Sequence, residues 1–300
     1  MKVLILGGSG FLGKHLIKSF SKNENVSIYT ITRNAFEVDG VSEKYFGNIL
    51  DVEFLKDSIN KIEPQIVFYL ISDFNHKKYD DLSTYLGNST KRVENLTSVV
   101  NDKTRIVYVG SAAQYGNTEK LKRKVVESDS FNPVSHYGLM KSFEEAQLKY
   151  FANKYKLNVV YTRIFNLIGP GEPSMTFSGS MVSQSLKKGH VNHGNLYPIR
   201  DFVDVRDAAN ALRIISKRGK KDSVYNICSS FGTKISDLLD LIIHNLGKEV
   251  ILEKNSDTNS REEIPKIVGC NKQLSKLGWI QRYSLENSVK DLIRFYLKYE

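Results

Sequence analysis

KVLILGGSGFLG, residues 2–13, decides the fold class of this 300-residue chain. Its first five residues, Lys2–Leu6, are typical of a buried strand, and glycines follow at Gly7, Gly10 and Gly13. A turn that lets a pyrophosphate reach the main chain needs residues without a Cβ, and the helix after it presents free N–H groups. A glycine triplet by itself marks many plain turns. Between a first strand and a helix, it predicts a dinucleotide-binding loop.

The alternation of strand and helix patterns continues through the first two-thirds of the chain. We expect four more strands and a helix at Phe11–Phe20; the strands are Val26–Ile31, Gln65–Ile71, Arg105–Gly110 and Asn158–Ile164. Short apolar runs that alternate with amphipathic helices indicate a parallel sheet covered on both faces. The sequence therefore predicts an α/β chain with a Rossmann-type, doubly wound parallel sheet.

The alternation of strands and helices changes after about Gly169, where the chain has the sequence GPGEPS. Further on, the pattern predicts a helix near Ile235–Leu246. We expect a smaller C-terminal α/β lobe that binds the substrate. In this division, residues 1–165 form the dinucleotide-binding domain and residues 195–228 return to it. Residues 166–194 and 229–300 form the substrate-binding lobe.

Composition narrows the classes of function. The chain has 43 Lys+Arg and 33 Asp+Glu, a formal charge of +10, yet its basic runs at 120–124 and 217–221 lack interleaved aromatics. Nucleic acid is therefore not an expected partner. Two isolated cysteines, Cys228 and Cys270, argue against a disulfide scaffold and for a reducing, cytoplasmic location. No apolar run approaches the roughly 20 residues of a membrane span.

The end of the second strand bears on the choice of cofactor. An acidic residue there would accept the ribose 2′-hydroxyl of NAD, whereas an arginine suits the 2′-phosphate of NADP. The chain has Arg33 at this point, which favours NADP(H) over NAD(H), unless Arg33 is a solvated surface residue. In YFGNILD (45–51), Asn48 either reaches the adenine or, like Asp51, caps a helix. The full set of predicted cofactor contacts is Gly7, Ser9, Gly10, Phe11, Leu12, Gly13, Arg33, Asn48, Ile49, Leu70, Tyr137 and Lys141.

A tyrosine and a lysine four residues apart share one face of a helix. A nearby ammonium favours the phenolate, so such a pair can move a proton to or from a carbonyl oxygen. The chain contains the spacing twice, as Tyr137–Lys141 and Tyr150–Lys154. The second pair lies ~20 Å further along the helix and roughly 220° around it. Tyr137–Lys141 opens the helix, where a site at the sheet edge is expected, and Tyr150 is expected to be partly buried.

Ser111 ends the strand in VYVGSAAQYG. Its hydroxyl can polarise a substrate oxygen beside Tyr137, or it can merely cap a turn. A metal centre is not expected, because His190 and His193 lie three apart without an evident third ligand.

The order and spacing of these motifs resemble the extended short-chain dehydrogenase/reductase superfamily. The resemblance extends to RIFNLIGPG (163–171), RDFVDVRDAANA (200–211), VYNICSSFGTKISDLLDL (224–241) and LSKLGW (274–279). The segments GNLYPIRDFVDVRD (194–207) and REEIPKIVGCNK (261–272) are most similar to those of the GDP-6-deoxy-D-mannose reductase branch. The resemblance implies NADPH-dependent reduction of the 4-keto group of a nucleotide-linked 4-keto-6-deoxyhexose, by a homodimer.

The resemblance also implies roles for individual residues. Ser111, Tyr137 and Lys141 would be the catalytic triad. The substrate would contact Ser111, Asn166, Arg200 and Arg261, with both arginines on its diphosphate.

Other reactions of the superfamily remain alternatives. Related dehydratases carry Asp-Glu after the Ser or Thr, whereas this chain has Ala112 and Ala113, so dehydration is disfavoured. An NAD-dependent nucleotide-sugar 4-epimerase and a non-catalytic NADP-binding relative are the remaining alternatives. Arg33 favours the reductase over the epimerase.

Overall fold

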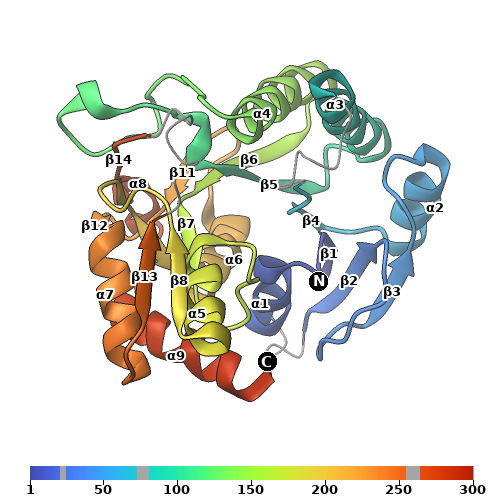
Figure 1. Cartoon of the computed structure of the whole chain (residues 1–300). Helices are drawn as coiled ribbons and strands as arrows, with labels where there is room; N and C mark the ends of the chain where they lie inside the picture. The colour runs from blue at the N-terminus through green and yellow to red at the C-terminus, as the bar shows by residue number, and fades with distance from the viewer. Residues whose placement is uncertain (21–24, 73–80, 255–263, 300) are drawn as a thin grey trace.

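A seven-stranded parallel sheet is the centre of the molecule (Figure 1). The computed structural model describes residues 1–20, 25–72, 81–254 and 264–299. The sheet order is β11-β6-β5-β4-β1-β2-β3. Its strands are β1 (Lys2–Leu6), β2 (Ser27–Thr32), β3 (Glu43–Phe46), β4 (Ile66–Tyr69), β5 (Arg105–Ser111), β6 (Asn158–Ile164) and β11 (Val224–Ile227). This order confirms the predicted Rossmann-type sheet.

The direction of winding reverses between β1 and β4. The chain first builds outward from β1 through β2 to β3, then returns to pair β4 with the other side of β1. In open α/β sheets, ligands bind outside the carboxyl ends of the strands at such a reversal. We therefore expect a ligand to bind at the loops after β1, β2 and β4.

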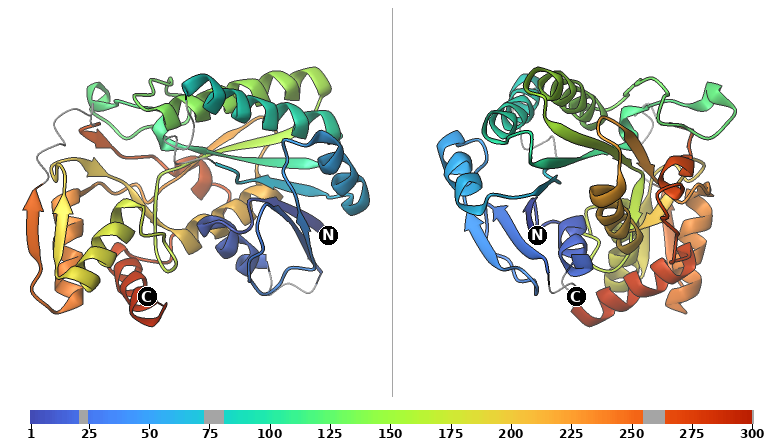
Figure 2. Two further views of the ribbon diagram at one scale, coloured as in Figure 1. Left: turned by 45° about the vertical axis from the view of Figure 1, so that its right-hand side comes forward. Right: turned by 180° about the vertical axis from the view of Figure 1, so that it is seen from behind.

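Helices cover both faces of the sheet (Figure 2). On one face, α1 (Phe11–Phe20) and α6 (Val205–Arg218) bury their apolar stripes against the strands. On the other face lie α2 (Val52–Ile62), α3 (Leu82–Val99) and α4 (His136–Tyr155). Because both faces are covered, β1 and β4 are almost entirely apolar and buried, as expected for a parallel sheet.

A second apolar core lies in the C-terminal part of the chain. It joins α5 (Phe177–Lys188), α7 (Ile235–Leu246) and α9 (Leu285–Tyr299). The remaining elements are η2 (Ala112–Gln114), η3 (Glu119–Leu121), β7 (Asn166–Ile168), β8 (His190–His193), β9 (Ile199–Arg200), β10 (Phe202–Asp204), β12 (Thr233–Lys234), β13 (Ile251–Lys254), β14 (Lys266–Ile267) and α8 (Lys272–Ser275). Strands β7 and β10 pair in parallel, as do β8 and β13.

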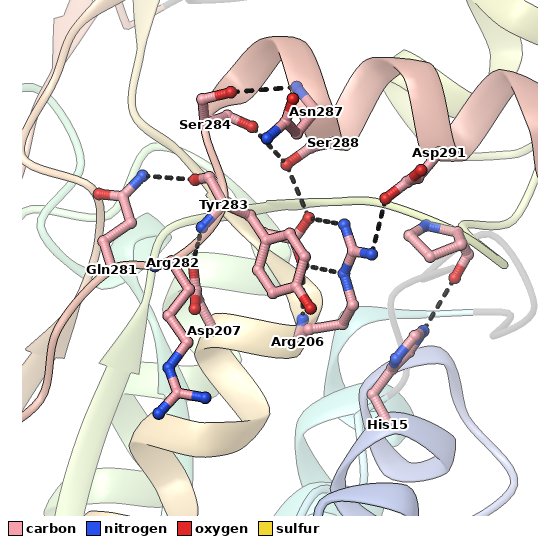
Figure 3. A network of polar contacts seen from close by, with 12 residues as sticks. His15, Arg206, Asp207, Gln281, Arg282, Tyr283, Ser284, Asn287, Ser288 and Asp291 are labelled. Carbon is pink, nitrogen blue, oxygen red and sulfur yellow. Dashed lines mark hydrogen bonds and ion pairs between the residues drawn. The ribbon is translucent and has the colours of Figure 1, made fainter.

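The two cores are closely connected. Leu274 of α8 and Trp279 belong to the core cluster that α1 and α6 form on the sheet, although both lie in the segment assigned to the substrate lobe. The Arg206 guanidinium donates to Asp204. Figure 3 shows the same guanidinium bonded to Asp291 and lying over the Tyr283 ring. These contacts join α6 to α9. These contacts couple the two lobes tightly. The domain boundaries themselves stay a prediction.

Several predicted bounds agree with the structure to the residue: β1, β6, α1 and α7. No helix within the described ranges combines the length and apolar character needed to cross a membrane.

Candidate active site

The loop between β1 and α1 has the backbone geometry that a phosphate loop requires. Gly7 has φ +92°, which residues with a Cβ rarely adopt. Gly13 packs so tightly that a Cβ there would clash with the carbonyl oxygen of Gly7. The Gly10 N–H donates to the same oxygen at 3.1 Å, and α1 begins at Phe11. The loop thus holds the start of α1, with its positive dipole end, against the carboxyl end of β1.

A cavity of about 230 Å³ opens beside this loop at the point where the sheet order reverses. Seven of the predicted cofactor contacts line it: Gly7, Ser9, Gly10, Arg33, Asn48, Ile49 and Leu70. Phe11, Leu12, Gly13, Tyr137 and Lys141 do not line this cavity. Its other lining residues are Ile31, Thr32, Gly47, Leu50, Ile71, Ser72, Asn88 and Arg92, so no described residue that lines it is acidic.

Two arginines face this cavity. Arg33, exposed after β2, was predicted; Arg92 of α3, only 6% exposed, was not. Nothing in the local pattern of α3 separates Arg92 from a surface residue, so sequence reasoning missed it. A cavity with two guanidinium groups and a glycine loop fits an anionic dinucleotide.

Of the two residues that follow β3, Asp51 is a helix cap, as one of the two interpretations held. The Asp51 carboxylate caps α2 by accepting from Phe54 N at 3.1 Å. Asn48 does not cap α2: its Oδ1 accepts from Leu50 N at 3.1 Å in the loop before the helix. Asn48 also lines the cavity, and its role toward adenine stays a prediction.

Ser111 ends β5 and opens the short turn η2. Its Oγ accepts from Ala113 N at 3.2 Å, and its own N–H donates to Gln114 Oε1 at 2.8 Å. Ser111 therefore does cap a turn. Because an accepting hydroxyl retains its own hydrogen, the side chain can still donate to a ligand.

The first turn of α4 brings Tyr137 to the same edge of the sheet. Ser135 caps the helix by accepting from Gly138 N at 3.0 Å. Gly138 itself packs on the η2 turn, where a Cβ would clash with the Ala113 carbonyl oxygen. Glycine at 138 thus allows close approach of the segments that carry Tyr137 and Ser111.

Lys141 lies one turn further along α4 and is buried, with 1% of its side chain exposed. Its ammonium donates to Glu144 Oε2 at 2.8 Å and to the carbonyl oxygens of Ile71 and Val109, each at 3.2 Å. Because an ammonium has three N–H donors, all of them have protein acceptors here. Ile71 also lines the cavity, so this residue connects the lysine to it.

Glu144 is a buried member of the site that sequence reasoning missed. A glutamate three residues after a lysine on a helix is typical of an exposed ion pair. Here the carboxylate is 1% exposed and accepts from Ser89 Oγ of α3 at 2.8 Å and from the Tyr108 hydroxyl at 3.2 Å. Burial, with the charges of Glu144 and Glu145, raises the pKa of Tyr108 well above its usual value, so its hydroxyl remains a donor.

The competing pair lies elsewhere on α4. Tyr150 is 62% exposed, so the expectation that it is partly buried is wrong. The rotation of roughly 220° between Tyr137 and Tyr150 turns the second pair away from the face that packs on α3 and the sheet. The Lys154 ammonium lies 6.0 Å from the Tyr150 ring centroid, at the surface.

The residues predicted to bind substrate are only partly placed. Asn166, exposed at the start of β7, donates from Nδ2 to Asp201 O at 3.0 Å. Arg200 of β9 is half-buried and donates to Ile199 O at 3.0 Å. Directly after Arg200, burial raises the pKa of the Asp201 carboxyl to about 6. Arg261 lies outside the described residues.

No group of three or more His, Cys, Asp or Glu side chains in the described part of the chain is arranged to hold a metal ion. His190 and His193 lie in β8, which pairs with β13.

Comparison with known proteins adds to this geometry. The model of a family described as the NAD dependent epimerase/dehydratase family matches residues 3–228. GDP-6-deoxy-D-talose 4-dehydrogenase from Aggregatibacter actinomycetemcomitans is 26% identical over 297 residues, covering 96% of this chain and 95% of the relative. UDP-glucose 4-epimerase from Lacticaseibacillus casei is 28% identical over 277 residues, 83% of each chain.

Solved structures share the fold over its full length. dTDP-glucose 4,6-dehydratase from Bacillus anthracis in complex with NAD matches with a TM-score of 0.89 at 19% identity, covering 100% of this chain and 97% of that one. RMD from Pseudomonas aeruginosa complexed with NADPH matches with a TM-score of 0.83 at 20% identity, covering 99% of each chain.

Proposed function

The chain belongs to the NAD dependent epimerase/dehydratase family, and from that premise we propose that it uses NADPH to reduce the 4-keto group of a nucleotide-diphospho-4-keto-6-deoxyhexose. The proposal treats Ser111, Tyr137 and Lys141 as the catalytic set. It also includes a homodimer in the cytoplasm.

The observation that carries the proposal is the charge of the cavity. Arg33 lies after β2, where an acidic residue would bind the 2′-hydroxyl of NAD, and no described residue lining the cavity is acidic. A guanidinium matches a 2′-phosphate through charge-assisted hydrogen bonds. A preference for NADP(H) favours net reduction, because a reductase exchanges its cofactor each turnover whereas a 4-epimerase retains NAD.

The proposed mechanism assigns one task to each side chain. The sugar carbonyl carbon would accept a hydride, which a reduced nicotinamide would supply when bound. Ser111 donates a hydrogen bond to the carbonyl oxygen, and Tyr137 protonates that oxygen as it becomes an alkoxide. The Lys141 ammonium acts on Tyr137 through its charge and contacts the cofactor ribose. Since Lys141 already has three protein acceptors, a contact with the ribose requires it to release one of them.

Substrate recognition is proposed on chemical grounds and on relatives. Arg200 and Arg261 would bind the diphosphate, and Asn166 would lie near it. The relative named GDP-6-deoxy-D-talose 4-dehydrogenase supports a 6-deoxyhexose and chemistry at C4, and RMD complexed with NADPH supports the cofactor. Ala112 and Ala113, which cannot transfer protons, stand directly after Ser111 and argue against dehydration.

The second candidate is an NAD-dependent nucleotide-sugar 4-epimerase. It is favoured by the identity of 28% to a UDP-glucose 4-epimerase. A direct assay separates the two: purified protein is mixed with NADPH and with GDP-, dTDP- or CDP-linked 4-keto-6-deoxy sugars, and NADPH absorbance is followed. Stoichiometric oxidation with at least one sugar is expected. No oxidation with any of them, together with interconversion of UDP-glucose and UDP-galactose, would identify the epimerase.

A further inference from the structure

Glu144 receives an unusual number of hydrogen bonds for a buried carboxylate. Oε1 accepts from Ser89 Oγ at 2.8 Å and from the Tyr69 hydroxyl at 3.3 Å. Oε2 accepts from Lys141 Nζ at 2.8 Å and from the Tyr108 hydroxyl at 3.2 Å. The donors come from β4, α3, β5 and α4, so four separate elements converge on one side chain. Hydrogen bonds and an opposite charge replace the water that such a carboxylate loses on burial.

The position of Glu144 on α4 relates it to the proposed catalytic pair. Tyr137, Lys141 and Glu144 are separated by four and three residues, which places all three on one stripe of the helix. Lys141 stands between the other two along this stripe. Its ammonium lies 5.8 Å from the Tyr69 ring centroid and 5.4 Å from the Tyr108 ring centroid, and aromatic faces favour a cation.

The burial of this pair gives the carboxylate an electrostatic consequence. Both side chains are 1% exposed, so solvent screens the charges of Lys141 and Glu144 poorly. The Glu144 carboxylate lies 2.8 Å from the Lys141 ammonium, so each charge has its counter-charge within the protein. The same negative charge opposes ionisation of a tyrosine on the same stripe.

We propose that Glu144 is a positioning residue for the Tyr137–Lys141 pair. Its carboxylate holds the Lys141 ammonium beside the carbonyl oxygens of Ile71 and Val109, and it offsets part of the field that this ammonium exerts on Tyr137. Without that carboxylate, the field of the ammonium on Tyr137 would be unopposed. This inference rests on the proposed reductase function for its role in turnover, but the charges it describes belong to the free protein as well.

The test is Glu144→Gln, a variant of nearly the same shape without the charge. Without the carboxylate, both Lys141 and Tyr137 should lose protons more readily. Both effects would move the alkaline limb of the profile of kcat/KM against pH toward lower pH. We expect the limb to move by about one pH unit toward lower pH. Tyr69 and Tyr108 are the other titratable groups that contact Glu144, and both are unchanged. An unmoved limb, with or without lower activity, overturns the proposal.

Glu94→Gln is the matched control. It makes the same change in net charge on α3, at a side chain 43% exposed that pairs with Lys91 instead. The alkaline limb of its kcat/KM profile should coincide with that of the wild type. A shift as large as in Glu144→Gln would show a general charge effect and would contradict a specific role.

If Glu144→Gln melts below the assay temperature, Glu144→Asp provides the second test. It keeps the charge but withdraws the carboxylate from Lys141 by one methylene. We expect at least a fivefold loss of kcat, with KM for the sugar within twofold and the alkaline limb unmoved. A kcat within twofold of the wild type would overturn the positioning role.

A third measurement separates this inference from the proposed function. Protein carrying ¹³Cζ-labelled tyrosine is titrated with NADP⁺ present, and the Tyr137 signal is identified as the one missing from Tyr137→Phe. Its titration midpoint should fall by about one unit in Glu144→Gln. If no sugar is reduced by the wild type, the proposed function fails, whereas the midpoint still decides the role of Glu144. An unchanged midpoint overturns the inference alone.

Discussion

Two tyrosines on α4 have the same spacing to a lysine, yet the fold gives them opposite surroundings. Tyr137 lies in the first turn beside the η2 segment, whereas Tyr150 is 62% exposed. The lysines differ as much, because Lys141 is buried with three acceptors and Lys154 lies near exposed rings. Of the two pairs, only Tyr137–Lys141 combines a buried lysine with a half-buried tyrosine.

Tyr137→Phe removes the proton donor, so kcat for NADPH oxidation should fall by about 10²-fold to 10⁴-fold. Tyr150→Phe should stay within twofold of the wild type. The two variants are compared at saturating NADPH, with melting temperatures measured alongside. A large loss in Tyr150→Phe and none in Tyr137→Phe would mean that the second pair is catalytic.

Arg33→Ala tests the preference for NADP(H). Losing a charge-assisted hydrogen bond to the 2′-phosphate costs about 1.5–3 kcal/mol, so KM for NADPH should rise roughly 10-fold to 100-fold. KM for NADH should change less than threefold, because NADH has no 2′-phosphate. Equal effects on both cofactors would mean that Arg33 does not contact that phosphate. Arg92→Gln, measured in parallel, reports whether the second guanidinium of the cavity shares the role.

At the scale of the element, the contact between η2 and the first turn of α4 decides the site. Gly138→Ala adds a methyl group that clashes with the Ala113 carbonyl oxygen and forces α4 away from Ser111. We expect a loss of at least tenfold in kcat and lower stability. Gly87→Ala is the control, because a Cβ there meets nothing within 4 Å in the middle of α3. It should stabilise the protein by about 0.4–1 kcal/mol. Full activity in Gly138→Ala would exclude the contact as a determinant.

Glu172, in the segment before α5, is a titrating group that should affect stability. Glu172 Oε1 accepts from Ser178 Oγ at 2.6 Å and from Thr176 Oγ1 at 2.5 Å. Its Oε2 is buried without a hydrogen-bond partner among the described residues. Burial raises the pKa of this carboxyl to about 7, although the hydrogen bonds oppose the shift. The folded state thus binds this proton more tightly than the unfolded state does.

A raised folded pKa gives stability that is complete below the unfolded pKa and is lost as pH rises through about 7. Between pH 4.5 and pH 8 the free energy of unfolding should therefore fall by an amount on the order of 3 kcal/mol from this group. Glu172→Gln should remove this slope in urea unfolding, and Glu286→Gln, at an exposed residue of α9, should retain it. A wild-type slope in Glu172→Gln would assign the pH dependence to other groups.

Local patterns predicted the elements that depend on local forces. The run before Gly7 and the four-residue spacing of Leu12, Leu16 and Phe20 each match the structure, since strand burial and helix amphipathicity are written into consecutive residues. Glu144 could not be found this way. Its burial depends on Ser89, 55 positions earlier in the chain, and on two neighbouring strands.

At the scale of the whole molecule, the two lobes share their packing. Trp279 follows α8, yet it packs in the core of the sheet and donates from Nε1 to Asp207 O at 3.0 Å. Arg206, which precedes Asp207 in α6, donates to Asp204 and, at 2.7 Å, to Asp291 of α9. The proposed site, with the sheet edge on one side and β7 and β9 on the other, would keep its geometry only if these lobes move little relative to each other.

This coupling predicts one unfolding transition for the whole chain. Arg206→Met keeps the aliphatic stem but leaves the fully buried Asp204 carboxylate without its counter-charge, which should cost about 3–5 kcal/mol. Arg294→Met removes the other arginine on Asp291, at a side chain 75% exposed, and should cost less than about 1 kcal/mol. Trp279, the single tryptophan, reports on the sheet core by fluorescence, and far-UV circular dichroism reports on all helices.

The two signals should coincide in urea for the wild type and for both variants, and the midpoint should fall only in Arg206→Met. Coincidence is expected because the Trp279 segment crosses from one core to the other, so neither core can lose its packing alone. If circular dichroism falls before the fluorescence changes, the C-terminal lobe unfolds on its own. In that event the contacts of Arg206 would hold α9 in place without making the lobes a single cooperative unit.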